Sequence, residues 1–205
     1  MNRIITIGRE FGSGGRELGK RLADELKIAY FDKEIIEAIA KETGLSEEYI
    51  NSISEKGISP YPFQFAKTFT TYSSLQSSQT EILLTERKII KDIASKGDCI
   101  IVGRGADTIL KEYDPINLFV YADMESKVNR CKLKASKDEN LSEKELEKMI
   151  KQIDKNRKKY YSLISSKEWG DMKNYHLCIN TSNREIKNLI PSLTNYIENW
   201  FKSRI

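Results

Sequence analysis

The chain has 205 residues, of which 39% are hydrophobic and 31% are charged, so it is long enough to bury one sizeable core beneath a polar surface. Its 34 Lys and Arg residues against 30 Asp and Glu residues give a net charge of only +4, which argues against a dedicated nucleic-acid binder and suits small anionic ligands. No apolar run approaches the roughly 20 residues that a membrane-spanning helix needs, so no membrane partner is expected.

The first predicted element is a short buried strand at residues 4–7, which leads into a glycine-rich turn and then a helix that begins near Ser13. The glycines of the turn let the backbone adopt positive φ and gather several amides in one small volume. They are Gly12, Gly14 and Gly15. These amides, together with the positive end of the following helix, suit a phosphate group.

The next third of the chain is predicted to be mainly helical. A second strand at 27–31 precedes a helix that Asp32 caps and Gly44 closes, and a short helix follows at 46–53. Prolines, aromatics and many Ser and Thr residues predict an irregular insert at 57–78. The apolar spacing then predicts a helix at 80–96.

The following stretch alternates strands with short connections. An apolar run at 99–102, bounded by turn residues, predicts a central strand of a parallel sheet. Gly103-Arg104-Gly105 and a brief helix come next, before a strand at 116–122.

The last third is predicted to contain three helices and one strand. Asp123 caps the first helix, and a capping box formed by Ser142 and Glu145 starts a long second one. The last strand is predicted at 176–180, and the final helix is expected to break or kink at Pro191.

Five alternations of strand and helix imply an α/β fold with a five-stranded parallel sheet and helices on both faces. Ligands of such sheets bind beyond the carboxyl ends of the strands. Three charged residues follow predicted strands, namely Arg16, Asp32 and Arg104. We therefore expect these side chains to converge beside the glycine-rich turn.

The cysteines indicate a reducing environment. Cys99, Cys131 and Cys178 are odd in number, widely spaced and each within an apolar stretch, which is typical of reduced core thiols. The first strand also begins almost at the N-terminus, where a signal peptide would lie. A cytoplasmic location is expected.

Short segments spread along the chain carry a family resemblance. Two of them are Ile-Gly-Arg-Glu-Phe-Gly-Ser-Gly-Gly-Arg-Glu at 7–17 and Tyr-Phe-Asp-Lys at 30–33. The others are Ile-Ile-Val-Gly-Arg-Gly at 100–105, Asp-Lys-Asn-Arg at 154–157 and Leu-Cys-Ile-Asn-Thr-Ser at 177–182. In this order they resemble the modified phosphate loop, the start of the monophosphate site, the Val-Asp-Gly-Arg-Asp segment, the arginine-rich lid and the final strand of the cytidylate kinase-like family of P-loop nucleoside monophosphate kinases.

The resemblance implies a single P-loop kinase-like domain over residues 1–205, with a three-layer fold and a small helical substrate and lid region. The substrate-side insert would lie around 44–80 and the lid around 136–170. The implied reaction moves the γ-phosphate of ATP, with Mg²⁺, to a nucleoside monophosphate, most of all CMP or dCMP.

Residue types and resemblance together give a candidate site. The residues predicted to bind ATP are Gly12, Ser13, Gly14, Gly15, Arg16, Glu17 and Lys155. Those predicted to bind the acceptor are Asp32, Lys33, Arg104 and Arg130. Arg16, Asp32 and Arg157 are the predicted catalytic residues, and Glu17 and Asp32 are the predicted Mg²⁺ ligands.

Several positions depart from the family pattern. Gly15 stands where the phosphate-loop lysine belongs and Glu17 replaces the hydroxyl that binds Mg²⁺, so Arg16 is the candidate for the missing charge. Val102 replaces an Asp, and nonpolar residues occupy positions that usually hold arginine. The latter are Ala38, Ile150 and Ile153. These changes leave the identity of the acceptor open.

Three alternative functions follow from the same features. The missing lysine also fits a nucleotide-binding regulatory module with little turnover, and the open acceptor fits a P-loop kinase for another small metabolite. Gly12-x-Gly14 with Asp32 about twenty residues later also fits a Rossmann dinucleotide site, although Glu17 occupies the third glycine position. In every case the partner is a small molecule, and the aromatic residues within 61–72 are compatible with a homo-oligomer.

Overall fold

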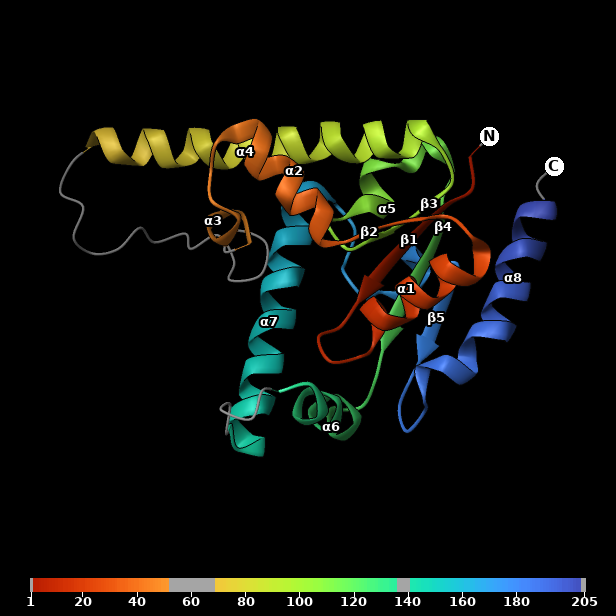
Figure 1. The fold of residues 1–205 in the computed structure, drawn as a ribbon. Helices are drawn as coiled ribbons and strands as arrows, with labels where there is room; N and C mark the ends of the chain where they lie inside the picture. The colour runs from red at the N-terminus through yellow and green to blue at the C-terminus, as the bar shows by residue number, and fades with distance from the viewer. Residues whose placement is uncertain (1, 52–68, 136–140, 204–205) are drawn as a thin grey trace.

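The computed structural model describes residues 2–51, 69–135 and 141–203. Within them the strands form one parallel sheet in the order β2-β3-β1-β4-β5 (Figure 1). The strands are β1 (Ile4–Arg9), β2 (Ala29–Phe31), β3 (Cys99–Val102), β4 (Ile116–Tyr121) and β5 (Leu177–Asn180). The predicted five-stranded parallel sheet is confirmed, and β3 lies directly beside β1.

Helices and short 3₁₀ turns connect the strands. The helices are α1 (Gly15–Leu26), α2 (Lys33–Thr43), α3 (Glu47–Asn51), α4 (Phe69–Lys96), α5 (Ala106–Ile109), α6 (Met124–Lys134), α7 (Glu143–Ile164) and α8 (Ile190–Lys202). The 3₁₀ turns are η2 (Lys111–Tyr113), η3 (Met172–Asn174) and η4 (Ile186–Leu189).

The two faces of the sheet are covered by different helices. The face that carries Ile5 and Ile7 packs against α1 and α8 through Leu18, Leu22 and Ile197. The opposite face packs against α2, α4, α5 and α7, so the sheet lies between two helical layers (Figure 1). All four residues of β3 are buried, as expected for a strand covered on both sides.

The helix that precedes β3 is longer than the sequence analysis predicts. Backbone at 69–78, predicted to belong to an irregular insert, is helical and forms the start of α4. The Ser and Thr residues there have modest helix propensity, but each costs only about 0.5 kcal/mol relative to alanine, so a helix that is stabilised elsewhere continues through them. The rest of the predicted insert, 57–68, and residues 52–53 of the predicted short helix lie outside the described residues.

Most of the predicted helix boundaries are confirmed. Asp123 caps α6, and the capping box of Ser142 and Glu145 is formed at the start of α7. Pro191 lies in the first turn of α8, after the 3₁₀ turn η4, so the predicted break is present. Asp32 occupies the N-cap position of α2, but its side chain makes no capping hydrogen bond, so its predicted role as a cap is wrong.

All three cysteines are free thiols, as predicted. Cys99 is buried, and Cys131 and Cys178 are half-buried. Across residues 2–51, 69–135 and 141–203, no helix is both long and apolar enough to cross a membrane.

The capping box gives a direct test of how α7 is held. Ser142→Ala removes the side-chain acceptor for the Glu145 amide, and we expect it to lower the free energy of unfolding by about 1 kcal/mol. Ser162→Ala is the matched control, because Ser162 is an exposed residue within the same helix, where alanine is the better helix former. Chemical denaturation measures both variants. Equal losses in the two would contradict a stabilising role for the cap.

Candidate active site

The glycine loop, residues 10–14, joins β1 to α1 at the carboxyl edge of the sheet. Gly12 and Gly14 have φ values of +75° and +82°, a region that L side chains rarely adopt. A Cβ on Gly12 would lie 3.0 Å from the Lys127 carbonyl oxygen, and one on Gly14 would lie 2.7 Å from Cδ1 of Ile186. The backbone of this loop is therefore packed closely against later parts of the chain. Gly14 is the N-cap residue of α1 and has no side chain to cap the first amides, an arrangement that suits an anion.

Hydrogen bonds from two distant elements hold the glycine loop. Thr181, just after β5, is fully buried and donates from Oγ1 to the Ser13 carbonyl over 2.7 Å. The Asp154 carboxylate on α7 accepts from the Phe11 amide over 2.7 Å. The loop amides are thus oriented by the protein itself, which is the condition for strong electrostatic binding.

A cavity of about 730 Å³ lies over the glycine loop and is bounded by α6 and α7. Its cationic lining residues are Arg9, Arg16, Arg130, Lys132, Lys134 and Arg157, and its acidic ones are Glu10 and Glu17. The volume is in the range typical of sites for small molecules, and the excess of positive charge fits a polyanion such as a triphosphate.

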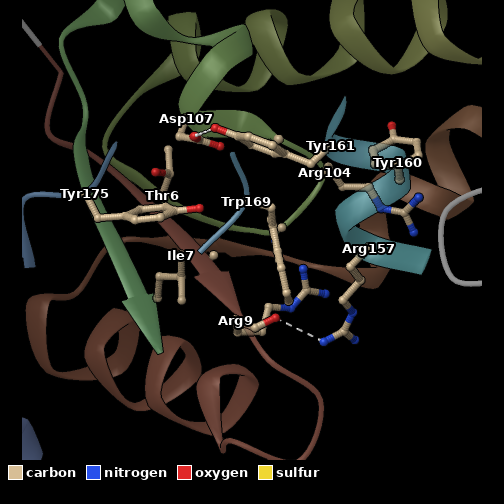
Figure 2. A pocket seen from close by; sticks show the side chains of 13 residues that line it. Thr6, Ile7, Arg9, Arg104, Asp107, Arg157, Tyr160, Tyr161, Trp169 and Tyr175 are labelled. Carbon is tan, nitrogen blue, oxygen red and sulfur yellow. Dashed lines mark hydrogen bonds between the residues drawn. The ribbon is translucent and has the colours of Figure 1, made fainter. Parts of the chain in front are cut away.

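Arg9, the last residue of β1, lies at the centre of the positive charge (Figure 2). Its side chain is only 14% exposed and forms an ion pair with Asp32, in which Nη2 and Oδ1 are 3.5 Å apart. Burial lowers the pKa of Arg9 from its ordinary value to about 9, and repulsion from Arg157, Arg104 and Arg16 adds to this shift while Asp32 opposes it. The sequence analysis did not select Arg9, although it lies inside the loop motif.

Arg104 lies beside Arg9 because their strands are paired. Ile7 pairs with Val102, and Arg9 and Arg104 come two residues after Ile7 and Val102 respectively. Arg104 has a φ of +57° between two glycines that also have positive φ, so the turn after β3 is tight and strained. Its side chain is 8% exposed and lies 3.6 Å from Glu86 on α4. It also donates to Asn51 Oδ1 over 3.4 Å.

Glu86 is an unpredicted member of the site. It is 1% exposed and accepts a hydrogen bond of 2.5 Å from the Tyr160 hydroxyl on α7. Burial raises the pKa of Glu86, and the neighbouring Arg104 opposes that rise. Among the described residues, Glu86 Oε2 and Arg104 Nη1 are buried atoms without a hydrogen bond, so they face each other as charges. The available signal was a glutamate four residues from both Ile82 and Ile90, within the apolar face of the helix.

Asp32 contacts one predicted site residue, Arg16, and one that was not predicted, Arg9. Its carboxylate is bonded to Arg16 Nε and lies 3.5 Å from Arg9. The Arg16 side chain is 57% exposed, so it lies at the rim of the site and not inside it. Of the three residues expected to converge, Arg16 and Asp32 are therefore in direct contact. Arg104 is near them because Arg9 is close to both Arg104 and Asp32.

A buried lysine links the glycine loop to the two helices that flank the cavity. Lys127 on α6 is 7% exposed and lies 2.6 Å from Glu10 and 3.4 Å from Asp154 on α7. Burial raises the pKa of Asp154, and its contacts with the Phe11 amide and Lys127 oppose that rise. These residues lie up to 144 positions apart in the sequence, so no local pattern predicts the cluster.

The remaining predicted site residues lie in varied places. Arg130 lines the cavity and donates to the carbonyls of Gly12, Thr181 and Arg184. Lys33 and Lys155 are exposed on α2 and α7, and neither is among the residues that line the cavity. Their assignments to the acceptor and to ATP stay predictions.

The predicted Mg²⁺ ligands, Glu17 and Asp32, are both engaged in ion pairs with cationic side chains. The Glu17 carboxylate lies 3.0 Å from Arg21 and 3.5 Å from Lys134, and the Asp32 carboxylate is held by two arginines. The described part of the chain contains no cluster of three or more metal-binding side chains. The assignment of Glu17 and Asp32 to Mg²⁺ therefore stays a prediction that these ion pairs do not favour.

A second cavity of about 50 Å³, called the inner cavity below, is also lined by Arg9 (Figure 2). Arg9 and Arg157 line both cavities. Trp169 and Tyr175 line the inner one and pack around Phe119 of β4, with ring centroids 5.3 Å and 4.8 Å from it. Arg157 also donates to the Arg9 carbonyl over 3.2 Å, so a residue of the predicted lid is tied directly to the end of β1.

The family of the chain follows from comparison with known proteins. The model of the cytidylate kinase-like family matches residues 4–183. The chain belongs to this family. Cytidylate kinases of two Saccharolobus islandicus strains, L.S.2.15 / Lassen #1 and M.14.25 / Kamchatka #1, are each 24% identical over 195 residues, which is 95% of this chain and 90% of theirs.

Solved structures agree on the fold. An uncharacterized protein from Eubacterium ventriosum ATCC 27560 is 27% identical and superposes with a TM-score of 0.68, covering 98% of this chain and 99% of that one. Shikimate kinase from Bacteroides thetaiotaomicron is 15% identical with a TM-score of 0.57, covering 97% and 99%. The predicted α/β P-loop kinase fold is confirmed.

The Lys127 cluster predicts a large difference between two lysines of α6. Lys127→Met removes the cation that Glu10 and Asp154 share and, among the described cations, leaves Asp154 only its 4.0 Å contact with Arg157, so we expect it to lower the free energy of unfolding by about 3–5 kcal/mol. Lys132→Met is the matched control, since Lys132 pairs with Glu143 at the surface, where such pairs contribute about 0–1 kcal/mol. Urea denaturation distinguishes them, and similar losses in the two variants would contradict the anchoring role of Lys127.

Proposed function

We propose that this protein transfers the γ-phosphoryl group of ATP to a nucleoside monophosphate, with CMP or dCMP as the preferred acceptor. The observation that carries the proposal is the convergence of Arg9, Arg104 and Arg157 beside the glycine loop. Phosphoryl transfer depends on positioning the phosphates and neutralising their charge, and these residues offer both. Family membership and the names of the curated relatives support cytidine nucleotides as acceptors.

The donor side of the site is the cavity over the glycine loop. We assign the ATP phosphates to the amides of the loop and of the first turn of α1, with Arg130 and Arg16 at the edges. Mg²⁺ is proposed to enter bound to the ATP phosphates and to neutralise part of their charge, since Mg²⁺ sites of kinases rely largely on phosphate oxygens and water.

The acceptor side begins at Arg104. Its guanidinium is held by Glu86 and Asn51, and a planar fork of this kind suits the oxygens of a monophosphate. Asp32 acts as a positioning residue, because it holds Arg9 and Arg16 together. An oxygen of the acceptor phosphate attacks the γ-phosphorus, a new P–O bond forms, the bond to the bridging β–γ oxygen breaks, and ADP leaves with that electron pair.

We also propose a cytoplasmic location, which the three free thiols support. Association of copies through residues 61–72 stays a prediction, since residues 61–68 of that segment lie outside the described part of the chain.

A transfer assay with γ-labelled ATP tests the proposal. We expect labelled product with CMP or dCMP at a kcat/KM at least about tenfold above that for AMP, GMP or UMP, a margin of about 1.4 kcal/mol. Transfer to a small hydroxylated metabolite, with none to any nucleoside monophosphate, would contradict the assignment of the acceptor. ATP binding without transfer to any compound would favour a regulatory module instead.

Arg104 should act on the acceptor and not on ATP. Arg104→Lys keeps a charge opposite Glu86 but removes the planar fork, so we expect the acceptor KM to rise about tenfold or more while the KM for ATP changes less than threefold. Arg87→Lys, at an exposed position next to Glu86, is the control and should change neither constant. An unchanged acceptor KM in Arg104→Lys would remove Arg104 from the acceptor site.

A further inference from the structure

Compared with a standard phosphate-binding loop, this chain has a cation at a position that is usually glycine and a glycine at the position that is usually lysine. A standard phosphate loop has the spacing Gly-x-x-x-x-Gly-Lys. Here Arg9 stands at the first position, Gly14 at the sixth and Gly15 at the seventh, so a cation occupies the place of the glycine and a glycine occupies the place of the lysine. We infer that Arg9 supplies the charge that the loop lysine supplies elsewhere, an inference that rests on the proposed phosphoryl transfer.

The stem of Arg9 fills the space in which a side chain at position 15 would begin. A Cβ placed on Gly15 would lie 2.6 Å from Arg9 Cβ and 3.1 Å from Arg9 Cγ. Cβ atoms essentially never approach another atom more closely than 3.0 Å. A lysine at position 15 and an arginine at position 9 are therefore mutually exclusive in this backbone.

The guanidinium end of Arg9 depends on a second glycine. A Cβ on Gly103 would lie 1.5 Å from Arg9 Nη1, and Gly103 has a φ of +77°. Gly15 from the start of α1 and Gly103 from the end of β3 thus flank the two ends of one side chain. The position of Arg9 explains Gly15, and Gly103, which its φ also requires, leaves room for the guanidinium.

The positive charge of Arg9 is only partly balanced by the described residues around it. Its 3.5 Å contact with Asp32 is shared with Arg16, and burial together with Arg157 lowers its pKa to about 9. An anion placed between Arg9 and the loop amides would relieve this repulsion. Arg9 lines both cavities, so its charge is accessible from the proposed donor side and from the side that Arg104 lines.

Other cations near the loop are already engaged. Lys127 is held by two carboxylates, and Arg130 is held by three backbone carbonyls. Arg16, the candidate from the sequence, is more than half exposed and is bonded to Asp32. Lys20 is also exposed and pairs with Asp24 on α1. The geometry therefore favours Arg9 over each of them.

The first test removes the charge of Arg9 and keeps its stem. Arg9→Met should bind inorganic tripolyphosphate at least about tenfold more weakly by calorimetry and should lower kcat by about a hundredfold or more, the usual effect of losing a transition-state charge contact. Circular dichroism and thermal unfolding confirm that the variant is folded. Arg21→Met is the matched control, because Arg21 is on the outer face of α1 and pairs with Glu17; it should change both quantities less than threefold.

The second test restores the standard order of the loop. Arg9→Gly and Gly15→Lys together create the spacing Gly-x-x-x-x-Gly-Lys, and each change alone should be harmful, the first by losing the cation and the second by colliding with Arg9. We expect the double variant to bind tripolyphosphate at least about tenfold more tightly than Arg9→Gly alone, a non-additivity that only contacting residues produce.

Either of two results would overturn the inference: a folded Arg9→Met protein within twofold of the wild type in tripolyphosphate affinity, or a double variant no better than Arg9→Gly. A wild-type protein that does not bind tripolyphosphate would overturn it as well. Tripolyphosphate binding that depends on Arg9, in a protein that transfers phosphate to no acceptor, would support the inference and contradict the proposed function.

Discussion

The burial of the Arg9 charge among other guanidinium groups is the constraint on which the site depends. Charges of one sign repel strongly where water is excluded, so such a cluster persists only if the rest of the fold holds it in place. Asp32 balances Arg9 and Arg16 together, and Glu86 balances Arg104. The carboxylates therefore compensate part of the charge, and this edge of the sheet keeps an excess of positive charge.

The scaffold fixes this arrangement through contacts that are distant in sequence. Thr181 after β5 and Asp154 on α7 hold the glycine loop, and Lys127 joins that loop to both helices of the cavity wall. Arg157 is bonded to the Arg9 carbonyl, so the helix that carries the predicted lid residues is connected to the end of β1. A displacement of α7 would consequently move the loop anchor Asp154 and the cation Arg157 together.

The fold could be predicted from the sequence because its elements are encoded locally. The buried strands, the capping box at Ser142 and the turn at Pro191 each arise from a few neighbouring residues, and the parallel order follows from alternation of strand and helix. The start of α4 was missed because weak propensity at 69–78 was taken as decisive, whereas helices extend through such residues when the remainder is packed.

The site was only partly predictable. The sequence selected the glycine loop, Arg104 and Arg157 because these follow strands or match a known motif, and the structure brings them together at the carboxyl edge of the sheet. It predicted Arg16 as the missing charge, since that is the cation nearest after the glycines, and it did not select Arg9, Glu86 or Lys127. Their positions depend on which side chains meet across the sheet, which the sequence alone does not show. The reason for a glycine at position 15 likewise requires the structure, in which a Cβ at that position would lie 2.6 Å from Arg9 Cβ.

A crystal structure of the protein with a non-hydrolysable ATP analogue and CMP would test the central claim most directly. The account predicts the guanidinium of Arg9 within about 3.2 Å of a β- or γ-phosphate oxygen, at ordinary hydrogen-bond distance, with the triphosphate along the glycine loop. A complex in which the phosphates lie in the loop but contact another cation, while Arg9 remains paired with Asp32 alone, would contradict it.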